Sequence, residues 1–351
     1  MIKYLGSKRR LVGVLGDLGE RSGARTALDL FTGTTRVAQE LKRRGVHVTA
    51  NDTARYSEVL ARCYVEADAA AVDGPRLDAQ LAELAALPGR DGYFTETFCR
   101  RARFLQPANG MRVDAIRDAL AERPDYAKHG AILLTALLEA ADRVDSTTGV
   151  QMAYLKQWAP RALRPLELRR PALLPGAGRA LRADALAVAP QLGEVDLAYL
   201  DPPYNQHSYF RNYHVWETLV AWDAPEHYGV ACKRLDCRDP ATRSVWNGRR
   251  TMPGALAELL ADVRARLVVL SYHDEGWLTL AQLRELASVR GHVEVLAFPS
   301  RRYVGAQIGV HDPQGRRVGR PGRLRNVEYV LVCGEAADVR AAVGPAERLA
   351  A

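Results

Sequence analysis

The hydrophobic and polar positions divide the chain into strand-like stretches on either side of a long helical stretch. Residues 26–31 and 46–52 are short apolar runs that flank a helical pattern over residues 34–44, with glycines at both turns. From residue 57 to 179 the apolar spacing is helical. Strand patterns then return at residues 180–184, 195–200, 266–272, 293–298 and 328–332. We predict an α/β core formed by residues 1–56 and 180–351, with a mostly parallel sheet and a helical insertion at residues 57–179.

The most informative motif follows the buried strand predicted at residues 195–200. It reads Asp201-Pro202-Pro203-Tyr204, and its two prolines fix an extended turn that aims the Asp201 carboxylate and the Pro202 carbonyl outward. Open α/β sheets bind ligands at this carboxyl edge. Two acceptors could take both hydrogens of an exocyclic amine such as adenine N6 and free its lone pair for attack on a methyl group, while Tyr204 stacks on the base. The alternative is a rigid strand exit with Tyr204 packed in the core.

A second pair of motifs lies at the ends of the first two predicted strands. The run 29–33, Asp-Leu-Phe-Thr-Gly, sits where the first strand meets its helix, and Asn51-Asp52 ends the second strand. Glycine there lets the backbone approach a ligand closely, and an acid after the next strand can accept both hydroxyls of a ribose. Asp52 could equally be the N-cap of the following helix.

Composition narrows the class of protein. The 351 residues carry a net charge of +8 and a sequence pI near 9.3, which favours a polyanionic partner. Five cysteines without framework spacing indicate free thiols in a reducing compartment. The chain shows no apolar run long enough to span a membrane and no signal peptide, so we expect a soluble cytoplasmic protein without membrane association. Cys232 and Cys237 near His227 have the wrong spacing for zinc, so we expect no metal.

These motifs and their order resemble the alpha group (Dam-like) of S-adenosylmethionine-dependent adenine-N6 DNA methyltransferases. The order is the N-terminal run 3–8, Lys-Tyr-Leu-Gly-Ser-Lys, then residues 29–33, an insertion, and Asp201-Pro202-Pro203-Tyr204. The resemblance covers nearly the whole chain. It implies a Rossmann-like class I methyltransferase sheet with an antiparallel last strand, S-adenosyl-L-methionine as cofactor, and an adenine flipped out of double-stranded DNA.

The resemblance also implies roles for individual residues. Those expected to bind the cofactor are Tyr4, Gly6, Ser7 and Lys8 at its methionine end, Asp29, Phe31 and Gly33 around its amino group and sulfonium, Asn51 and Asp52 at the ribose, and Asp184 near the adenine. Two positions depart from the family pattern. Thr35 stands where a second glycine is common, which suggests a tighter turn, and Ala183 precedes Asp184 where glycine or a small polar residue is common. Lys8 could alternatively be a solvated lysine in a basic run.

Candidate DNA contacts lie in three segments. In the loop after the catalytic turn we expect Tyr209 and Arg211 to contact DNA, whereas His214 has the spacing of a packed helix residue. The segment 301–325 combines seven arginines with the single acid Asp312 and reads as a basic hairpin. Its arginines are Arg301, Arg302, Arg316, Arg317, Arg320, Arg323 and Arg325. In the insertion the candidates are Thr147, Thr148, Tyr154 and Lys156.

We therefore expect a site-specific adenine-N6 methyltransferase acting on duplex DNA. The close alternatives are cytosine-N4 methylation of DNA and adenine-N6 methylation of RNA, which use the same amine chemistry. A non-catalytic nucleic-acid-binding protein would keep the basic hairpin but has no need for both Asp201 and Lys8. A cognate restriction endonuclease is a candidate partner, and either a monomer or a dimer fits the sequence.

Overall fold

The central feature of the fold is a seven-stranded sheet. The computed structural model describes residues 1–152, 157–301, 310–311, 317–319 and 325–344. The sheet contains β1 (Thr26–Asp29), β2 (His47–Asp52), β3 (Arg179–Arg182), β4 (Val195–Leu200), β7 (Ala265–His273), β8 (His292–Arg301) and β11 (Arg325–Gly334), in the order β3-β2-β1-β4-β7-β11-β8. Strand pairs β1–β4, β2–β3 and β4–β7 are parallel, and β11 is antiparallel to β7 and β8. The predicted mostly parallel sheet with an antiparallel last strand is confirmed.

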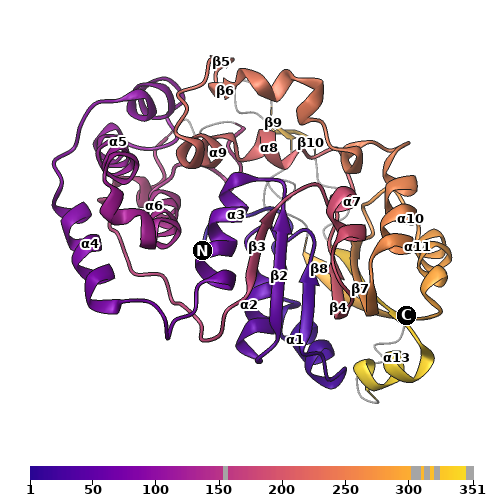
Figure 1. Cartoon of the computed structure of the whole chain (residues 1–351). Helices are drawn as coiled ribbons and strands as arrows, with labels where there is room; N and C mark the ends of the chain where they lie inside the picture. The colour runs from indigo at the N-terminus through magenta and orange to yellow at the C-terminus, as the bar shows by residue number, and fades with distance from the viewer. Residues whose placement is uncertain (153–156, 302–309, 312–316, 320–324, 345–351) are drawn as a thin grey trace. The chain divides into compact units, whose positions relative to one another are not determined.

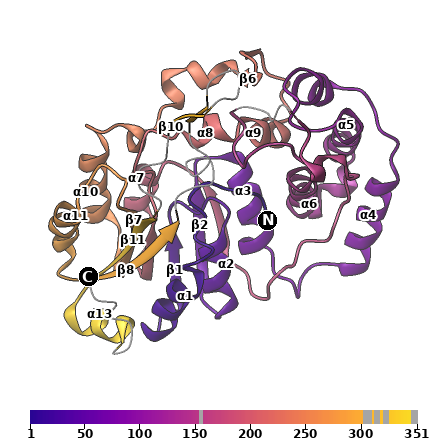
Figure 2. The ribbon, with the colours of Figure 1, turned by 180° about the vertical axis from the view of Figure 1, so that it is seen from behind.

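One of two compact units contains most of this sheet. It comprises Gly13–Phe31, Ala185–His207 and Ser244–Ala351. Its helices are α1 (Val12–Arg21), α7 (Ala185–Val188), α10 (Met252–Asp262), α11 (Leu280–Ala287) and α13 (Ala336–Val343). Leu256, Leu259 and Leu283 from α10 and α11 are buried against Val268 and Leu270 of β7. Figures 1 and 2 show α10 and α11 side by side on this part of the sheet, so β4 and β7 are held from one face by apolar packing.

The second compact unit is mainly helical. It comprises Met1–Val12, Thr32–Asp184 and Ser208–Arg243. Besides β2 and β3, this unit contains the helices α2 (Arg36–Arg43), α3 (Arg55–Ala61), α4 (Gly74–Ala86), α5 (Pro107–Glu122), α6 (Gly130–Arg143), α8 (Tyr209–Asn212) and α9 (His214–Ala221). It also contains the π-helices Arg62–Glu66 and Thr95–Arg101 and the two-residue strands β5 (His227–Tyr228) and β6 (Lys233–Arg234). Figure 1 shows α4, α5 and α6 together in this unit.

The boundaries of the compact units differ from the predicted segments, because residues 1–12, 32–56 and 208–243 group with the insertion rather than with the rest of the predicted core. Helix α9 shows why for the last of these segments. Its apolar residues Val215, Trp216 and Leu219 are buried in the same core as Phe98 of the insertion. The helix therefore packs with the insertion although it follows the Asp201–Tyr204 turn in sequence. Target recognition by residues 57–179 stays a prediction.

The basic segment lies between two antiparallel strands, as predicted. Arg325 of β11 is opposite Arg301 of β8, and the short strands β9 (Val310–His311) and β10 (Arg317–Gly319) pair antiparallel between them. Several predicted DNA-contact residues lie outside the described residues, namely Tyr154, Lys156, Arg302, Arg316, Arg320 and Arg323. Within the described residues, no helix combines the length and the apolar character needed to cross a membrane.

Candidate active site

The turn at Asp201 leaves the carboxyl end of β4, which has parallel neighbours on both sides. Pro202 is buried, whereas Asp201 and Tyr204 are partly exposed. Asn247 fixes the loop that follows, because its side-chain Nδ2 donates hydrogen bonds to the backbone carbonyls of residues 205 and 207 at 2.9 and 3.0 Å. The turn thus leaves a carboxylate within reach of solvent on a rigid base.

Tyr204 packs against the end of β7. Its ring stacks on the imidazole of His273, with centroids 5.8 Å apart and planes 10° from parallel, and is tilted against Tyr272 at 5.4 Å. The hydroxyl of Tyr272 is in turn held by the amide of Leu278 at 3.0 Å. An aromatic side chain fixed in this way can offer its ring to a planar ligand without first losing rotamer freedom.

Asp29 and Asp201 are brought to the same edge of the sheet. Asp29 ends β1 in register with Tyr199 of β4, and the next amide, that of Leu30, donates to the Tyr199 carbonyl at 3.3 Å. The Asp29 side chain is buried, with 1% exposure. Two carboxylates at the ends of adjacent parallel strands create a negative edge that suits a cationic ligand.

Phe31, two residues further on, contacts Trp246 edge to face at 5.0 Å. Trp246 is 3% exposed and belongs to the short 3-10 helix Val245–Asn247. This helix therefore supports Phe31 and, through Asn247, the loop after the Asp201–Tyr204 turn.

Asp52 holds the glycine turn in the helical unit. Its Oδ2 accepts the amide of Gly33 at 2.9 Å and its Oδ1 accepts the amide of Ala54 at 3.0 Å. Burial raises the pKa of Asp52, although the amides of Ala54 and Gly33 oppose that shift. The N-cap of α3 is Ala54, so Asp52 is not the N-cap considered from the sequence.

Thr35 has a backbone conformation that glycine adopts more readily. Its φ of 64° and ψ of 14° are left-handed, close behind Gly33 with φ of 49°. This geometry is strained for a β-branched residue. The Thr35 hydroxyl compensates in part, since it donates to the Thr34 carbonyl at 2.7 Å and accepts from Gln39 Nε2 at 2.7 Å.

The N-terminal segment lies against this turn. A Cβ added to Gly33 would lie 3.0 Å from the Tyr4 ring, a tight contact, and the positive φ of this residue also favours glycine. Burial raises the pKa of Tyr4 well above its ordinary value, which keeps the phenol neutral. Lys8 is 6% exposed, so the alternative of a solvated lysine is wrong. Gly6 has a φ of 76°, and Ser7 is exposed.

Asn51 shapes the site rather than facing solvent. It is fully buried, and its side chain exchanges two 3.1 Å hydrogen bonds with the backbone of Ala183. These two hydrogen bonds fix the backbone just after β3. The next residue, Asp184, is exposed. Ala183 thus meets Asn51 through its main chain, which needs no particular side chain.

Tyr209 and Arg211, which were expected to contact DNA, have partners within the protein. Tyr209 stacks on Tyr4 at 5.1 Å, and its hydroxyl lies 3.4 Å from the Leu5 carbonyl. Arg211 donates from Nε to the Cys237 carbonyl at 3.0 Å. Both side chains stay partly exposed.

Thr147 and Thr148, the two candidate DNA contacts of the insertion that the structure describes, differ in their exposure. Thr147 is 2% exposed, and its hydroxyl donates to Asp145 Oδ2 at 2.5 Å and accepts from the Gly149 amide at 3.1 Å. Thr148 is exposed. Within this loop, Thr148 is therefore better placed than Thr147 to meet another molecule.

Sequence patterns did not reveal His273, Asn247, Gln151 or Glu217. Gln151 joins the insertion loop to α9, because its carbonyl accepts from His214 Nε2 and its Oε1 accepts from the Val215 amide, both at 2.9 Å. The contacts of these residues arise from tertiary packing, and no local motif marks them. His214 itself is fully buried, which confirms the prediction of a packed helix residue.

The chain is similar in sequence to known DNA methyltransferases. The family described as D12 class N6 adenine-specific DNA methyltransferase matches residues 4–282. The Type II methyltransferase M.NlaIII of Neisseria lactamica is 29% identical over 318 residues, which cover 86% of this chain and 92% of that protein. The Type II methyltransferase M.CviAII of Paramecium bursaria Chlorella virus 1 is 27% identical, covering 86% and 92%. The modification methylase StsI of Streptococcus sanguinis is 26% identical, and the match covers 88% of this chain but only 50% of that protein.

Proposed function

The chain belongs to the D12 class of N6 adenine-specific DNA methyltransferases, and we propose that it takes the methyl group from S-adenosylmethionine and acts on an adenine flipped out of duplex DNA. Methylation of adenine N6 in DNA is the activity by which this family is described, and two relatives are named as a type II methyltransferase and a modification methylase. The observation that carries the proposal is the turn from Asp201 to Tyr204 at the carboxyl end of β4, beside Asp29 at the end of β1.

The described residues fit a nucleoside that carries an amino acid and a sulfonium. The buried carboxylate of Asp29 and the ring of Phe31 suit the cationic amino and sulfonium groups. The turn at Gly33 brings main chain close to Tyr4, and Gly6, Ser7 and Lys8 continue this segment. Asp52 and Asn51 would hold and shape the ribose site, with Asp184 near the cofactor adenine. When bound, S-adenosylmethionine supplies an electrophilic methyl group.

The catalytic turn prepares the target amine for attack. The Asp201 carboxylate and the Pro202 carbonyl accept the two N6 hydrogens, which localises the lone pair on nitrogen. Pro203 keeps the turn extended, and Tyr204 stacks on the base. As N6 takes the methyl group, the methyl–sulfur bond would break and S-adenosylhomocysteine would be the leaving group. Positive charge would develop on N6, where the Asp201 carboxylate would stabilise it until the methylated amine loses its extra proton.

DNA is held by surfaces outside the catalytic turn. We assign phosphate and base contacts to the basic segment with Arg301, Arg317 and Arg325, and to Thr148, Tyr209 and Arg211. Thr147 shapes its loop. Several relatives are named type II or modification methylases, which supports a cognate restriction endonuclease as the partner activity.

Methylation assays test this proposal directly. Purified protein, a duplex library and S-adenosylmethionine should yield N6-methyladenine in one sequence context on long-read sequencing, and the product should resist a nuclease specific for that context. No modified adenine with wild type under these conditions, or equal yield with D201A, would overturn the assignment.

A further inference from the structure

Helix α3 begins beside the proposed ribose carboxylate without a cap from its own sequence. Its N-cap residue is Ala54, which makes no side-chain capping hydrogen bond. The first amides of a helix have no partner within the helix and need an external acceptor. Asp52 Oδ1 accepts the amide of Ala54, the residue before the first turn of α3. A group that fixes the position of this turn therefore also helps to fix the orientation of the Asp52 side chain.

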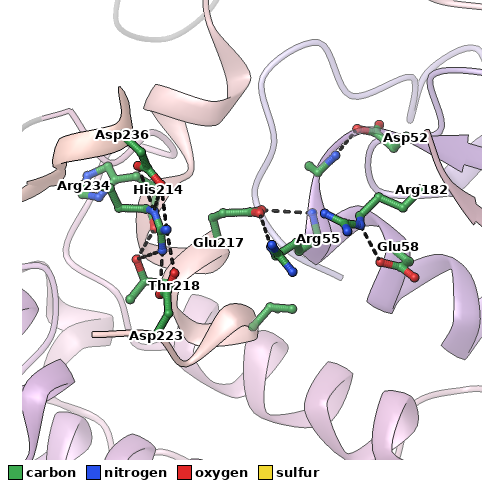
Figure 3. Close-up of polar contacts among 12 residues, drawn as sticks. Asp52, Arg55, Glu58, Arg182, His214, Glu217, Thr218, Asp223, Arg234 and Asp236 are labelled. Atoms are coloured by element: carbon green, nitrogen blue, oxygen red, sulfur yellow. Dashed lines mark hydrogen bonds and ion pairs between the residues drawn. The ribbon is translucent and has the colours of Figure 1, made fainter. Parts of the chain in front are cut away.

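Glu217 of α9 supplies the missing acceptor. Its Oε2 accepts the amide of Arg55 at 3.0 Å, and its Oε1 lies 3.4 Å from Arg55 Nε. Figure 3 shows the Glu217 side chain extending from α9 toward Arg55, with Asp52 near the same end of α3. Glu217 is 4% exposed. A buried carboxylate at a helix N-terminus also complements the helix dipole.

The charge of this carboxylate is sensitive to pH. Burial raises the pKa of Glu217 to about 7, while the amide and guanidinium of Arg55 and the charge of Arg234 oppose the shift. The phenol of Tyr56 also faces it from α3. Arg234 of β6 is itself held by Asp223 at 2.7 and 2.8 Å. Arg55 is thus the positive group in direct contact with the carboxylate.

The helix that carries Glu217 is anchored to the insertion. Gln151 accepts hydrogen bonds from His214 and Val215 in the first turn of α9. The Thr218 hydroxyl, one residue after Glu217, donates to the His214 carbonyl at 2.8 Å. The Glu217 carboxylate therefore reaches the start of α3 from a fixed element.

We propose that Glu217 is a positioning residue for cofactor binding, which holds the first turn of α3 so that Asp52 keeps the orientation that meets the ribose hydroxyls. The inference rests on the proposed function, because it takes Asp52 as the ribose ligand. The ionised carboxylate is a better acceptor than the protonated one for the amide of Arg55. Cofactor affinity is therefore higher when Glu217 is charged and falls as it becomes protonated.

Calorimetric titration of the full chain with S-adenosylmethionine at pH 6 and pH 8 tests the inference. Glu217→Gln should weaken binding about 5- to 10-fold at pH 8, which corresponds to the net contribution of one ordinary hydrogen bond. Wild type should approach the variant at pH 6, where both lack the charge. The matched control is Glu40→Gln, the same change at a glutamate of α2 that is 5% exposed and paired with Arg43 and with Arg44, the residue that follows the helix. It should bind like wild type.

A second variant keeps the test informative if Glu217→Gln folds poorly. Arg55→Ala retains the main-chain amide but removes the adjacent positive charge, so the pH midpoint of cofactor affinity should move upward. An unmoved midpoint, or unchanged affinity of Glu217→Gln at both pH values, overturns the inference. Asp52→Ala distinguishes failure of the proposed ribose role of Asp52 from failure of the inference about Glu217. If it binds like wild type, the proposed ribose role fails, whereas weakened binding beside a normal Glu217→Gln rejects only the role of Glu217.

Discussion

The ring of Tyr204 lies almost parallel to the imidazole of His273, at a centroid distance of 5.8 Å. The last residue of β7 thereby supports the aromatic residue of the catalytic turn from one side. A base that stacks on Tyr204 would benefit from this support, because the ring is held in place before the base arrives.

His273→Ala should therefore reduce kcat/KM for DNA about 2- to 12-fold, the equivalent of a stacking contribution of about 0.5–1.5 kcal/mol. His273→Phe keeps a flat ring and should restore most of the loss. Fluorescence of 2-aminopurine at the target position would report whether the base still leaves the duplex. Equal kinetics of the alanine variant and wild type would show that the stack has no role in catalysis.

Asp201→Asn should lower kcat roughly 100- to 1000-fold while the affinity for S-adenosylmethionine stays near wild type, since the amide keeps the shape but lacks the charge that stabilises the developing positive nitrogen. Single-turnover methylation of a duplex substrate measures this effect. Activity within a few-fold of wild type would remove Asp201 from the catalytic group.

The sequence predicted those parts of the site that depend on neighbouring residues. Strand β4 has its predicted bounds, residues 195–200, and the catalytic turn and Asp29 follow directly from strand ends. By contrast, Glu217 meets Arg55 across 162 positions of sequence, and Asn247 meets the carbonyl of Asn205 across 42. Such contacts arise from tertiary packing, which hydrophobic periodicity does not encode.

The left-handed backbone conformation of Thr35 could not be predicted from the sequence either, because β-branched residues rarely adopt it. Thr35→Gly should be about 1 kcal/mol more stable than Thr35→Ala, since alanine keeps the Cβ that opposes this conformation and caps a helix less well than glycine. Chemical denaturation of the two variants compares them directly. Equal stability would mean that residue 35 is not left-handed in solution.

Glu217 and Glu40 should respond to pH with opposite signs. The folded-state pKa of Glu217 is raised from 4.5 to about 7 by burial, so its ionisation destabilises the fold as the pH rises through this window. The free energy of unfolding of Glu217→Gln should therefore increase by about 3 kcal/mol relative to that of wild type between pH 4.5 and 7.

For Glu40, the effect of burial on the pKa is outweighed by hydrogen bonds from Arg43 and Arg44, which lower it. Its contribution to stability is present above pH 4.5 and is lost as the pH falls through the lowered pKa.

Glu40→Gln should accordingly be less stable than wild type at neutral pH, with a difference that shrinks in acid. Urea titrations of the three proteins across this range measure both trends. If the stability of Glu217→Gln ran parallel to wild type over the whole range, the Glu217 carboxyl would titrate normally and could not act as a neutral-pH switch.

The basic segment between β8 and β11 should determine how strongly DNA binding depends on salt. Arg316→Glu with Arg317→Glu should weaken duplex binding and reduce the slope of log affinity against log salt by about 1.8, or about 0.9 for each lost phosphate contact. Arg284→Glu with Arg340→Glu makes the same charge change at exposed positions of α11 and α13 and should alter the slope much less. Fluorescence anisotropy at several salt concentrations measures both. Equal slopes for the two double variants would mean that net charge, rather than this segment, attracts the duplex, and the contacts would then have to come from the insertion around Thr148.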